Sequence, residues 1–298
     1  MASDPATLQG TIIAAYGRRF VVECADGVTY DCVTRGKRTD YACGDRVSFT
    51  PQDSSQGSIE DCMPRTTLLY RSDQWRQKLI AANVTQAVIV VAAVPSFDLN
   101  VLDCCLAAVE HAGIRPLIVL NKADLPECAR AENALTLFTA MGYARIKLAA
   151  RHDVAALRPH LAGQRSVLVG ESGMGKSTIL NQLLPQAAAA TQEVSAALGT
   201  GRHTTSHARL YHLDATSDLI DTPGVQAFGV HHLAIAELAA AFIEFRPWLE
   251  LCRFRDCRHL EEPGCAISDA QQAGHIAAQR LAAYRRLAQE NLRRQKNF

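Results

Sequence analysis

The sequence of 298 residues contains no long hydrophobic run, no low-complexity tract and no internal repeat. Its longest apolar run, Ala87 to Pro95, is far shorter than the ~20 residues that cross a bilayer as a helix. The first ten residues, MASDPATLQG, have neither the basic nor the apolar part of a signal peptide, so we expect none. These absences exclude membrane-spanning, fibrous and repeat proteins. We expect a cytoplasmic monomer with no membrane partner.

Net charge is also nearly absent. The 31 Lys and Arg residues balance 30 Asp and Glu residues, which leaves a formal charge of +1 at pH 7. The chain as a whole therefore does not indicate a nucleic-acid partner, and only local charge can do so. The last segment is basic, with Glu290 as its single acid, which is typical either of a solvated helix face or of an RNA contact. Its basic residues are Arg280, Arg285, Arg286, Arg293, Arg294 and Lys296.

Ten cysteines are present, but they lack the regular spacing of a small secreted disulfide protein. Seven of them, from Cys24 to Cys128, are typical of reduced thiols used as small apolar residues. The other three lie near a histidine and have the spacing of metal ligands. Three thiolates and one imidazole complete a tetrahedral Zn²⁺ site with no position for water, so we predict one structural zinc ion rather than an accidental grouping. The ligands are Cys252, Cys257, His259 and Cys265, and the arginines between them, Arg253, Arg255 and Arg258, can contact RNA phosphates.

Hydrophobic periodicity divides the chain into three regions. Up to about Arg71, short strands separated by turn signals favour a small β-barrel such as an OB-fold, although other small barrels give the same pattern. From about Ala87, strands alternate with helices, which predicts a mainly parallel sheet covered on both faces. After about His231 the chain is helical again. We therefore expect a multidomain protein: an OB-fold barrel at residues 1–72, an α/β domain at 73–231 and a helical zinc-binding domain at 232–298.

The expected elements can be stated by range. The barrel strands are Thr11–Ala15, Phe20–Cys24, Val28–Val33, Arg46–Thr50 and Ser58–Met63. In the α/β domain, strands are expected at Ala87–Val94, Leu117–Leu120, Ser166–Val169 and Asp218–Ile220, with helices near Val101–His111, Ala131–Met141 and Lys176–Leu184. A last helix is expected from Asp269 onward.

A phosphate-binding loop lies between a predicted strand and a predicted helix. Its residues, GESGMGKS, carry glycines and a Lys-Ser pair at the positions that the P-loop motif requires. Backbone N–H groups of the loop and the helix N-terminus would surround phosphate oxygens. Lys176 would neutralise the β- and γ-phosphates, and Ser177 would ligate Mg²⁺. The nucleotide-binding residues of this loop are Gly170, Glu171, Ser172, Gly173, Met174, Gly175, Lys176, Ser177 and Thr178.

The segment Asn121-Lys-Ala-Asp124 follows another predicted strand and selects the base. The carboxylate of Asp124 can accept from both N1–H and the exocyclic amine of guanine. Adenine has no N1–H and would leave a buried charge unpaired. Asn121 would hold the loop, and Lys122 would lie over the purine. The sequence thus predicts GTP or GDP as the ligand and disfavours the rival interpretation, a P-loop ATPase.

The segment Asp221-Thr-Pro-Gly224 completes the nucleotide site. Asp221 would hold Mg²⁺ and the Gly224 N–H would contact the γ-phosphate, although such a segment is by itself typical of a plain turn. The order of the motifs is circularly permuted, because in most GTPases the guanine-binding motif comes last. Val225 follows the segment, and an apolar side chain cannot orient the attacking water, so we expect slow intrinsic hydrolysis.

With these motifs in place, the chain resembles the ribosome small-subunit-dependent GTPase A family of bacteria over nearly its whole length. Further matching segments are Arg35-Gly-Lys37, Gly44-Asp45, Ala82-Asn-Val84, Gly201–Thr205 and Glu262–Cys265. The resemblance implies an OB-fold, a GTP hydrolase stimulated by the small ribosomal subunit, contact with 16S rRNA and a role in late subunit maturation. A nucleotide-gated RNA-binding regulator with incidental hydrolysis is the alternative to an assembly factor that hydrolyses GTP in order to leave.

The resemblance also assigns the first switch to Gly201–Thr205, with Thr205 (or Thr204) ligating Mg²⁺ beside Ser177 and Asp221. We take Lys176, Thr205 and His203 as catalytic. Our hypothesis is that His203 orients the water once the ribosome orders the switch; alternatively, His203 only packs or binds RNA. Two positions depart from the family. Lys147-Leu-Ala149 replaces a Ser-Ala-type segment whose backbone contacts the base, and Thr85 replaces an Asp.

Overall fold

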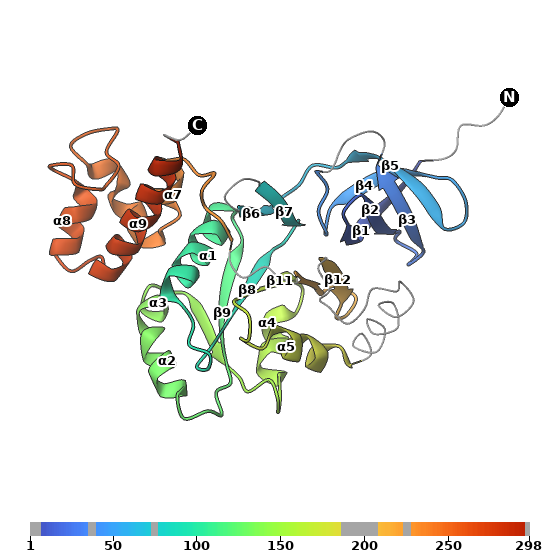
Figure 1. Ribbon diagram of the computed structural model, residues 1–298, viewed down its shortest axis with the longest axis horizontal. Helices are drawn as coiled ribbons and strands as arrows, with labels where there is room; N and C mark the ends of the chain where they lie inside the picture. The colour runs from blue at the N-terminus through green and yellow to red at the C-terminus, as the bar shows by residue number, and fades with distance from the viewer. Residues whose placement is uncertain (1–6, 35–39, 73–76, 186–207, 223–227, 296–298) are drawn as a thin grey trace.

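The computed structural model describes residues 7–34, 40–72, 77–185, 208–222 and 228–295. A β-barrel, a sheet flanked by helices and a helical unit follow one another along the chain (Figure 1). This architecture confirms the predicted fold class. Among the helices of the described ranges, none combines the length and apolar character that crossing a membrane requires.

The amino-terminal unit is a closed barrel of five strands. Its strands are neighbours in the order β1, β2, β3, β5, β4, and β4 pairs back with β1. Every pair is antiparallel except β3 with β5, which is the topology of an OB-fold. Large side chains such as Phe20 and Phe49 fill its interior. The strands are β1 (Leu8–Tyr16), β2 (Arg19–Glu23), β3 (Thr29–Thr34), β4 (Arg46–Pro51) and β5 (Gln56–Cys62), so all five expected strands are confirmed.

The central unit is a sheet in the order β10, β9, β8, β11, β13, β12. All neighbours are parallel except β12, which runs antiparallel to β13. The short strands β10 and β12 were not expected from the sequence, because each has only four residues, of which two are apolar and two are basic. The strands are β8 (Gln86–Ala92), β9 (Arg115–Asn121), β10 (Ala144–Lys147), β11 (Arg165–Val169), β12 (Arg209–His212) and β13 (Asp218–Asp221).

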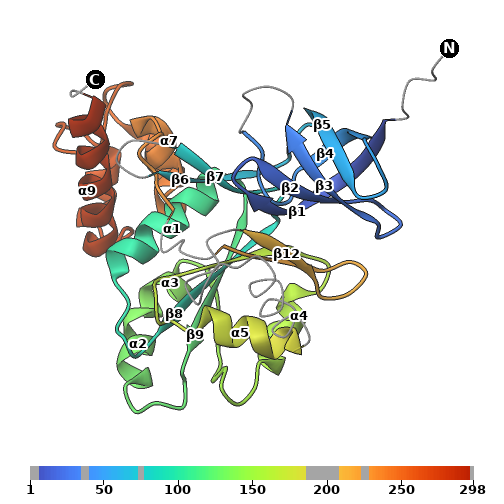
Figure 2. The ribbon, with the colours of Figure 1, turned by 45° about the vertical axis from the view of Figure 1, so that its right-hand side comes forward.

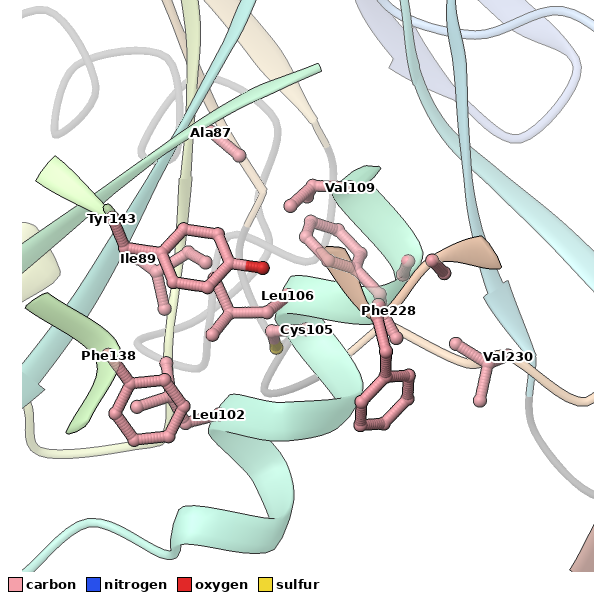
Figure 3. Packing of buried hydrophobic residues seen from close by; sticks show 14 of the residues in the cluster. Ala87, Ile89, Leu102, Cys105, Leu106, Val109, Phe138, Tyr143, Phe228 and Val230 are labelled. Atoms are coloured by element: carbon pink, nitrogen blue, oxygen red, sulfur yellow. The ribbon is translucent and has the colours of Figure 1, made fainter. Parts of the chain in front are cut away.

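Helices cover both faces of this sheet, and every residue of β8 is buried between them. Alternate residues of β8 face opposite sides: Ile89 packs with α1 (Leu99–His111), and Val90 packs with α4 (Arg158–Leu161) and α5 (Lys176–Leu183). Figure 3 shows Leu102, Cys105, Leu106 and Val109 of α1 in the first of these cores. Each fully buried large apolar side chain contributes roughly 1.5–3 kcal/mol. Instead of one helix at Ala131–Met141, the chain forms α2 (Cys128–Ala134) and α3 (Thr136–Ala140).

The barrel and the central sheet join edge to edge. Ala14 of β1 pairs with Arg209 of β12, which makes one sheet of eleven strands (Figure 2). At this junction His212 lies between two carboxylates: its Nε2 is 2.6 Å from Glu23 Oε2 and its Nδ1 is 2.7 Å from Asp218 Oδ1. Burial lowers the pKa of His212, but hydrogen bonds to both carboxylates outweigh burial and raise it.

A second set of contacts crosses the same junction. The side chain of Asn83 donates to Gly44 O of the barrel loop at 2.9 Å and accepts from Thr66 N at 2.9 Å.

Thr85, one of the two family departures, accepts from Arg165 N at 3.0 Å and donates to Gln164 Oε1 at 2.9 Å. Thr85 therefore holds the chain just before β8 to the start of β11. The hairpin of β6 (Leu68–Ser72) and β7 (Gln77–Ala82) lies beside these contacts.

The carboxy-terminal unit consists of α7 (Ile235–Ala240), the 3₁₀ helix η2 (Ile243–Leu251), α8 (Ala266–Gln272) and α9 (Ala278–Gln295). The single helix expected from Asp269 onward is thus two helices, because Gly274 has a left-handed φ of +81° that ends the first. Phe242, Phe245 and Tyr284 form an aromatic cluster between η2 and α9.

Two basic residues of α9 have partners inside the protein. Arg280 is fully buried and pairs with Asp103 of α1 and with Glu244 of η2, where Arg280 Nε lies 2.6 Å from Glu244 Oε1. Its guanidinium also stacks 4.3 Å from the ring centroid of Phe242. Arg285 donates to His259 O at 3.3 Å and to Ser268 Oγ at 3.0 Å. Full burial excludes Arg280 from both a solvated face and an RNA contact, whereas the partly buried Arg285 joins α9 to the zinc loop.

Candidate nucleotide and metal sites

The three predicted nucleotide motifs lie at one edge of the central sheet. Asn121 ends β9, Gly170 follows β11 and Asp221 ends β13. Because these strands are parallel and close together in the order β9, β8, β11, β13, their carboxyl ends meet. The permuted order of the motifs therefore leaves their arrangement in space intact.

The phosphate loop is too closely packed for side chains at two of its glycines. Gly170 has a φ of +143°, and a Cβ there would lie 2.2 Å from Val90 O. Gly175 has a φ of +98°, and a Cβ there would lie 2.1 Å from Asn121 Nδ2. Glycine at both positions lets the loop approach β8 and the base-binding segment, and α5 begins directly afterwards at Lys176.

Lys176 and Asp221 provide opposite charges at the phosphate end of the site. Lys176 Nζ donates to Gly170 O at 2.5 Å and to Glu171 O at 2.9 Å. Burial lowers the pKa of Lys176 while Asp221 opposes that shift, and burial raises the pKa of Asp221 while Lys176 opposes it. Ser177, in the first turn of α5, is exposed. A serine hydroxyl and a carboxylate are oxygen ligands of the kind that Mg²⁺ prefers.

The base-binding segment is tied to the phosphate loop by side chains. Asn121 is buried; its Nδ2 donates to Met174 O at 2.8 Å and its Oδ1 accepts from Ala150 N at 3.0 Å. Lys122 Nζ donates to Val94 O at 2.5 Å and to Gly173 O at 2.8 Å. Asp124 remains partly exposed, as a base-contacting carboxylate must.

Three features of this corner were not predicted. The backbone N–H of Ala150 holds Asn121, the carbonyl of Val94 holds Lys122, and His152 Nε2 lies 3.7 Å from Asp124 Oδ2. Backbone groups carry no residue signature, so no sequence pattern could have identified the first two. His152 lies three residues beyond Lys147-Leu-Ala149, the segment expected near the base, and that proximity is a signal that could have been used.

The second family departure, Lys147-Leu-Ala149, occupies the end of β10 and the turn after it. Lys147 Nζ lies 3.0 Å from Glu132 Oε2, and Leu148 is buried. The backbone of Leu148 makes two hydrogen bonds to the base-binding strand and loop: its N–H donates to Leu120 O and its carbonyl accepts from Ala123 N. The side chains of these two residues are therefore occupied elsewhere, and the backbone from Ala149 onward borders the base-binding corner.

Three predicted site residues lie outside the described residues. They are His203 and Thr205 of the first switch and Gly224 of the Asp221 segment.

The four predicted zinc ligands come together beneath α9. Their ligand atoms all lie within 4.8 Å of one another. His259 Nδ1 lies 3.5, 3.6 and 3.5 Å from the sulfurs of Cys252, Cys257 and Cys265. With Zn–S bonds of about 2.3 Å and Zn–N bonds of about 2.0–2.1 Å, a tetrahedral site requires a nitrogen–sulfur separation of about 3.5 Å. The cluster therefore has the donor set and the spacing of a structural zinc site.

Comparisons with known proteins agree with this arrangement. A family model described as RsgA GTPase matches residues 62–231. A protein of Nitrosomonas europaea named small ribosomal subunit biogenesis GTPase RsgA is 51% identical, over 94% of this chain and 91% of its own. A protein of the same name from Neisseria meningitidis serogroup B is also 51% identical, over 91% of this chain and 88% of its own.

Two solved structures are similar over nearly their whole length. The crystal structure of YjeQ from Thermotoga maritima has a TM-score of 0.73 at 27% identity, and covers 96% of this chain and 99% of that one. The structure of YloQ, described as a circularly permuted GTPase, has a TM-score of 0.72 at 27% identity, with 97% and 96% covered. The motifs, their arrangement at one sheet edge and these similarities lead to one conclusion: the chain belongs to the RsgA GTPase family.

Proposed function

We propose that this protein is a GTPase that binds the small ribosomal subunit late in its maturation and hydrolyses GTP to leave it. The observation that carries the proposal is the joining of Asp124, the phosphate loop and Asp221 at one sheet edge, in a chain half identical to proteins named small ribosomal subunit biogenesis GTPases. It would act in the cytoplasm, as a monomer made of the three domains expected from the sequence.

In the nucleotide site, each group has a separate role. Asp124 accepts from guanine, Asn121 joins the base segment to the phosphate loop, and the loop N–H groups surround the phosphates. Lys176 stabilises charge on the β- and γ-phosphates. Ser177, Asp221 and Thr205 would hold Mg²⁺, which would supply further charge stabilisation when bound. The remaining contacts are Lys122, Gly170, Glu171, Ser172, Gly173, Met174, Gly175, Thr178 and Gly224.

Hydrolysis would depend on the ribosome. His203 is proposed to orient the attacking water when contact with the subunit orders the first switch, because the residue after the Asp221 segment, Val225, is apolar. Intrinsic turnover is then slow, and the bound subunit becomes the activator.

The contact with 16S rRNA is proposed for the zinc loop. Arg253, Arg255 and Arg258 are exposed, and the guanidinium of Arg253 stacks 5.4 Å from the ring centroid of Phe254, which is itself 42% exposed. Arginines can pair with phosphates, and an exposed aromatic ring can stack on an unpaired base. The structural zinc ion would keep this loop in shape.

Cosedimentation with small ribosomal subunits tests the proposal. The protein with a non-hydrolysable GTP analogue should pellet with small subunits, and the protein with GDP should not. A hydrolysis-deficient variant should remain on the subunit in GTP, which distinguishes an assembly factor from a regulator whose hydrolysis is incidental. Equal binding in GTP and GDP would contradict the proposal.

A further inference from the structure

The zinc loop contains one residue in an unfavourable backbone conformation. His259 has a φ of +58°, in the left-handed region that residues with a Cβ rarely adopt. The residue is buried, and its Nδ1 lies 3.5–3.6 Å from all three sulfurs. This conformation must be stabilised by the surrounding contacts.

One carboxylate binds the backbone on both sides of His259. Glu262 Oε2 accepts from Leu260 N at 2.9 Å and from Glu261 N at 3.2 Å. Glu262 Oε1 accepts from Arg258 N at 3.3 Å. Three backbone N–H groups thus converge on one side chain. One belongs to the residue before the histidine and two belong to the residues after it.

Helix α9 binds the opposite side of the same turn. Tyr284 Oη donates to Arg258 O at 2.7 Å, and Arg285 Nε donates to His259 O at 3.3 Å. The carbonyls of the turn are therefore held by α9, while its N–H groups are held by Glu262. Glu262 lies within the zinc loop itself, between His259 and Cys265, whereas Tyr284 and Arg285 belong to α9.

We propose that Glu262 is a positioning residue for the zinc ion. It does not ligate the metal, since three thiolates and one imidazole already complete the tetrahedron. It fixes the turn that directs His259 Nδ1 toward the sulfurs, as residues beyond the direct ligands commonly do. This inference rests on the proposed zinc site.

Charge repulsion acts in the opposite direction. Glu262 Oε2 lies 3.9 Å from Cys257 Sγ, so with zinc bound a carboxylate would stand beside a thiolate ligand. If repulsion were dominant, removing the carboxylate would strengthen zinc binding. If positioning is dominant, as proposed, removing it weakens zinc binding.

Three variants of the full chain separate the two effects. Glu262→Ala removes every acceptor, whereas Glu262→Gln removes the charge but keeps an oxygen that can accept from Leu260 N and Glu261 N. Glu261→Ala, at the exposed neighbouring position, is the matched control. Transfer of zinc to a chromophoric chelator gives the affinity of each, and the visible spectrum of the Co²⁺-loaded proteins reports the ligand set.

Positioning predicts that Glu262→Ala binds zinc about 10- to 100-fold more weakly than the control. Glu262→Gln should stay within about threefold of the original protein, because it keeps the bonds from Leu260 N and Glu261 N. It loses only the longest of the three backbone bonds and a 3.5 Å ion pair with the exposed Arg258 side chain. Unchanged GTP affinity shows that the central unit of each variant is folded, and an unchanged Co²⁺ spectrum shows that the four ligands still assemble. Equal zinc affinity of Glu262→Ala and Glu261→Ala, or tighter binding by both Glu262 variants, overturns the inference. Absence of zinc from the unsubstituted protein would instead overturn the proposed zinc site, and this inference with it.

Discussion

The side-chain amide of Asn121 donates to the backbone carbonyl of Met174 at 2.8 Å and lies where a Cβ of Gly175 would be. This hydrogen bond joins the base-binding segment to the phosphate loop, although 48 residues of sequence separate Asn121 from Gly170. Because the two segments are joined in space, their order along the chain can change. The permuted chain keeps one nucleotide site for this reason.

Gly175→Ala should therefore damage nucleotide binding through Asn121. A Cβ at position 175 would displace the Asn121 side chain and break its two buried hydrogen bonds, each worth about 1–1.5 kcal/mol. We expect GDP affinity to fall roughly 100-fold in a fluorescence titration.

Gly142→Ala is the matched control. Gly142 has a φ of +97°, nearly that of Gly175, but a Cβ there would have no atom within 4 Å. The two variants share the backbone strain, but only the one at position 175 lies in the phosphate loop and meets Asn121. Equal GDP affinity of both variants would contradict the role given to Asn121.

Asp124→Asn should change the base preference. The asparagine can still accept from N1–H, but its NH₂ group opposes the exocyclic amine of guanine and matches the C2 carbonyl of xanthine. GTP affinity should fall at least about tenfold and XTP affinity should rise. Competition titrations with GTP, XTP and ATP measure this, with Glu127→Gln in the same loop as the control. If Asp124→Asn still preferred GTP over XTP, Asp124 would not be the residue that contacts the base.

Arg280→Ala should destabilise the contact between α9 and α1. The substitution leaves the buried carboxylates of Asp103 and Glu244 without their partner. Breaking a buried ion pair in this way typically costs about 3–5 kcal/mol. Urea unfolding measures the loss, and Arg293→Ala, at an exposed position of the same helix, should change the free energy of unfolding by less than about 0.5 kcal/mol. Similar free energies of unfolding for the two variants would show that Arg280 does not stabilise the contact between α9 and α1.

The junction between barrel and sheet should weaken as pH rises. The pKa of His212 is raised in the folded protein, because the hydrogen bonds and charges of Glu23 and Asp218 outweigh burial. A raised pKa contributes stability that is fully present below the unfolded value of about 6.5 and is lost as pH rises through the folded value. The free energy of unfolding should therefore fall, as pH rises above about 6.5, by more in the original protein than in His212→Gln. Parallel pH profiles would show that His212 does not contribute.

The sequence predicted those parts of the structure that local chemistry determines. The glycines of the phosphate loop, the position of Asp124 after a strand and the spacing of Cys252 to Cys265 each follow from motif chemistry. Alternating turn signals predicted all five barrel strands. The contributions of Arg280 and Glu262 could not be predicted, because Asp103 is distant in sequence from Arg280 and the partners of Glu262 are backbone groups. In the same way β12 was missed, since its pairing with β1 depends on a barrel strand almost two hundred residues earlier.

The central claim, that this chain is a GTPase that responds to the small ribosomal subunit, is tested most directly by the rate of GTP hydrolysis. The purified protein should be assayed alone, with small subunits and with large subunits, and ATP should replace GTP in a parallel series. The account predicts slow hydrolysis by the protein alone and strong stimulation by small subunits only, for GTP only. Hydrolysis that small subunits leave unchanged, while GTP still binds, would contradict it.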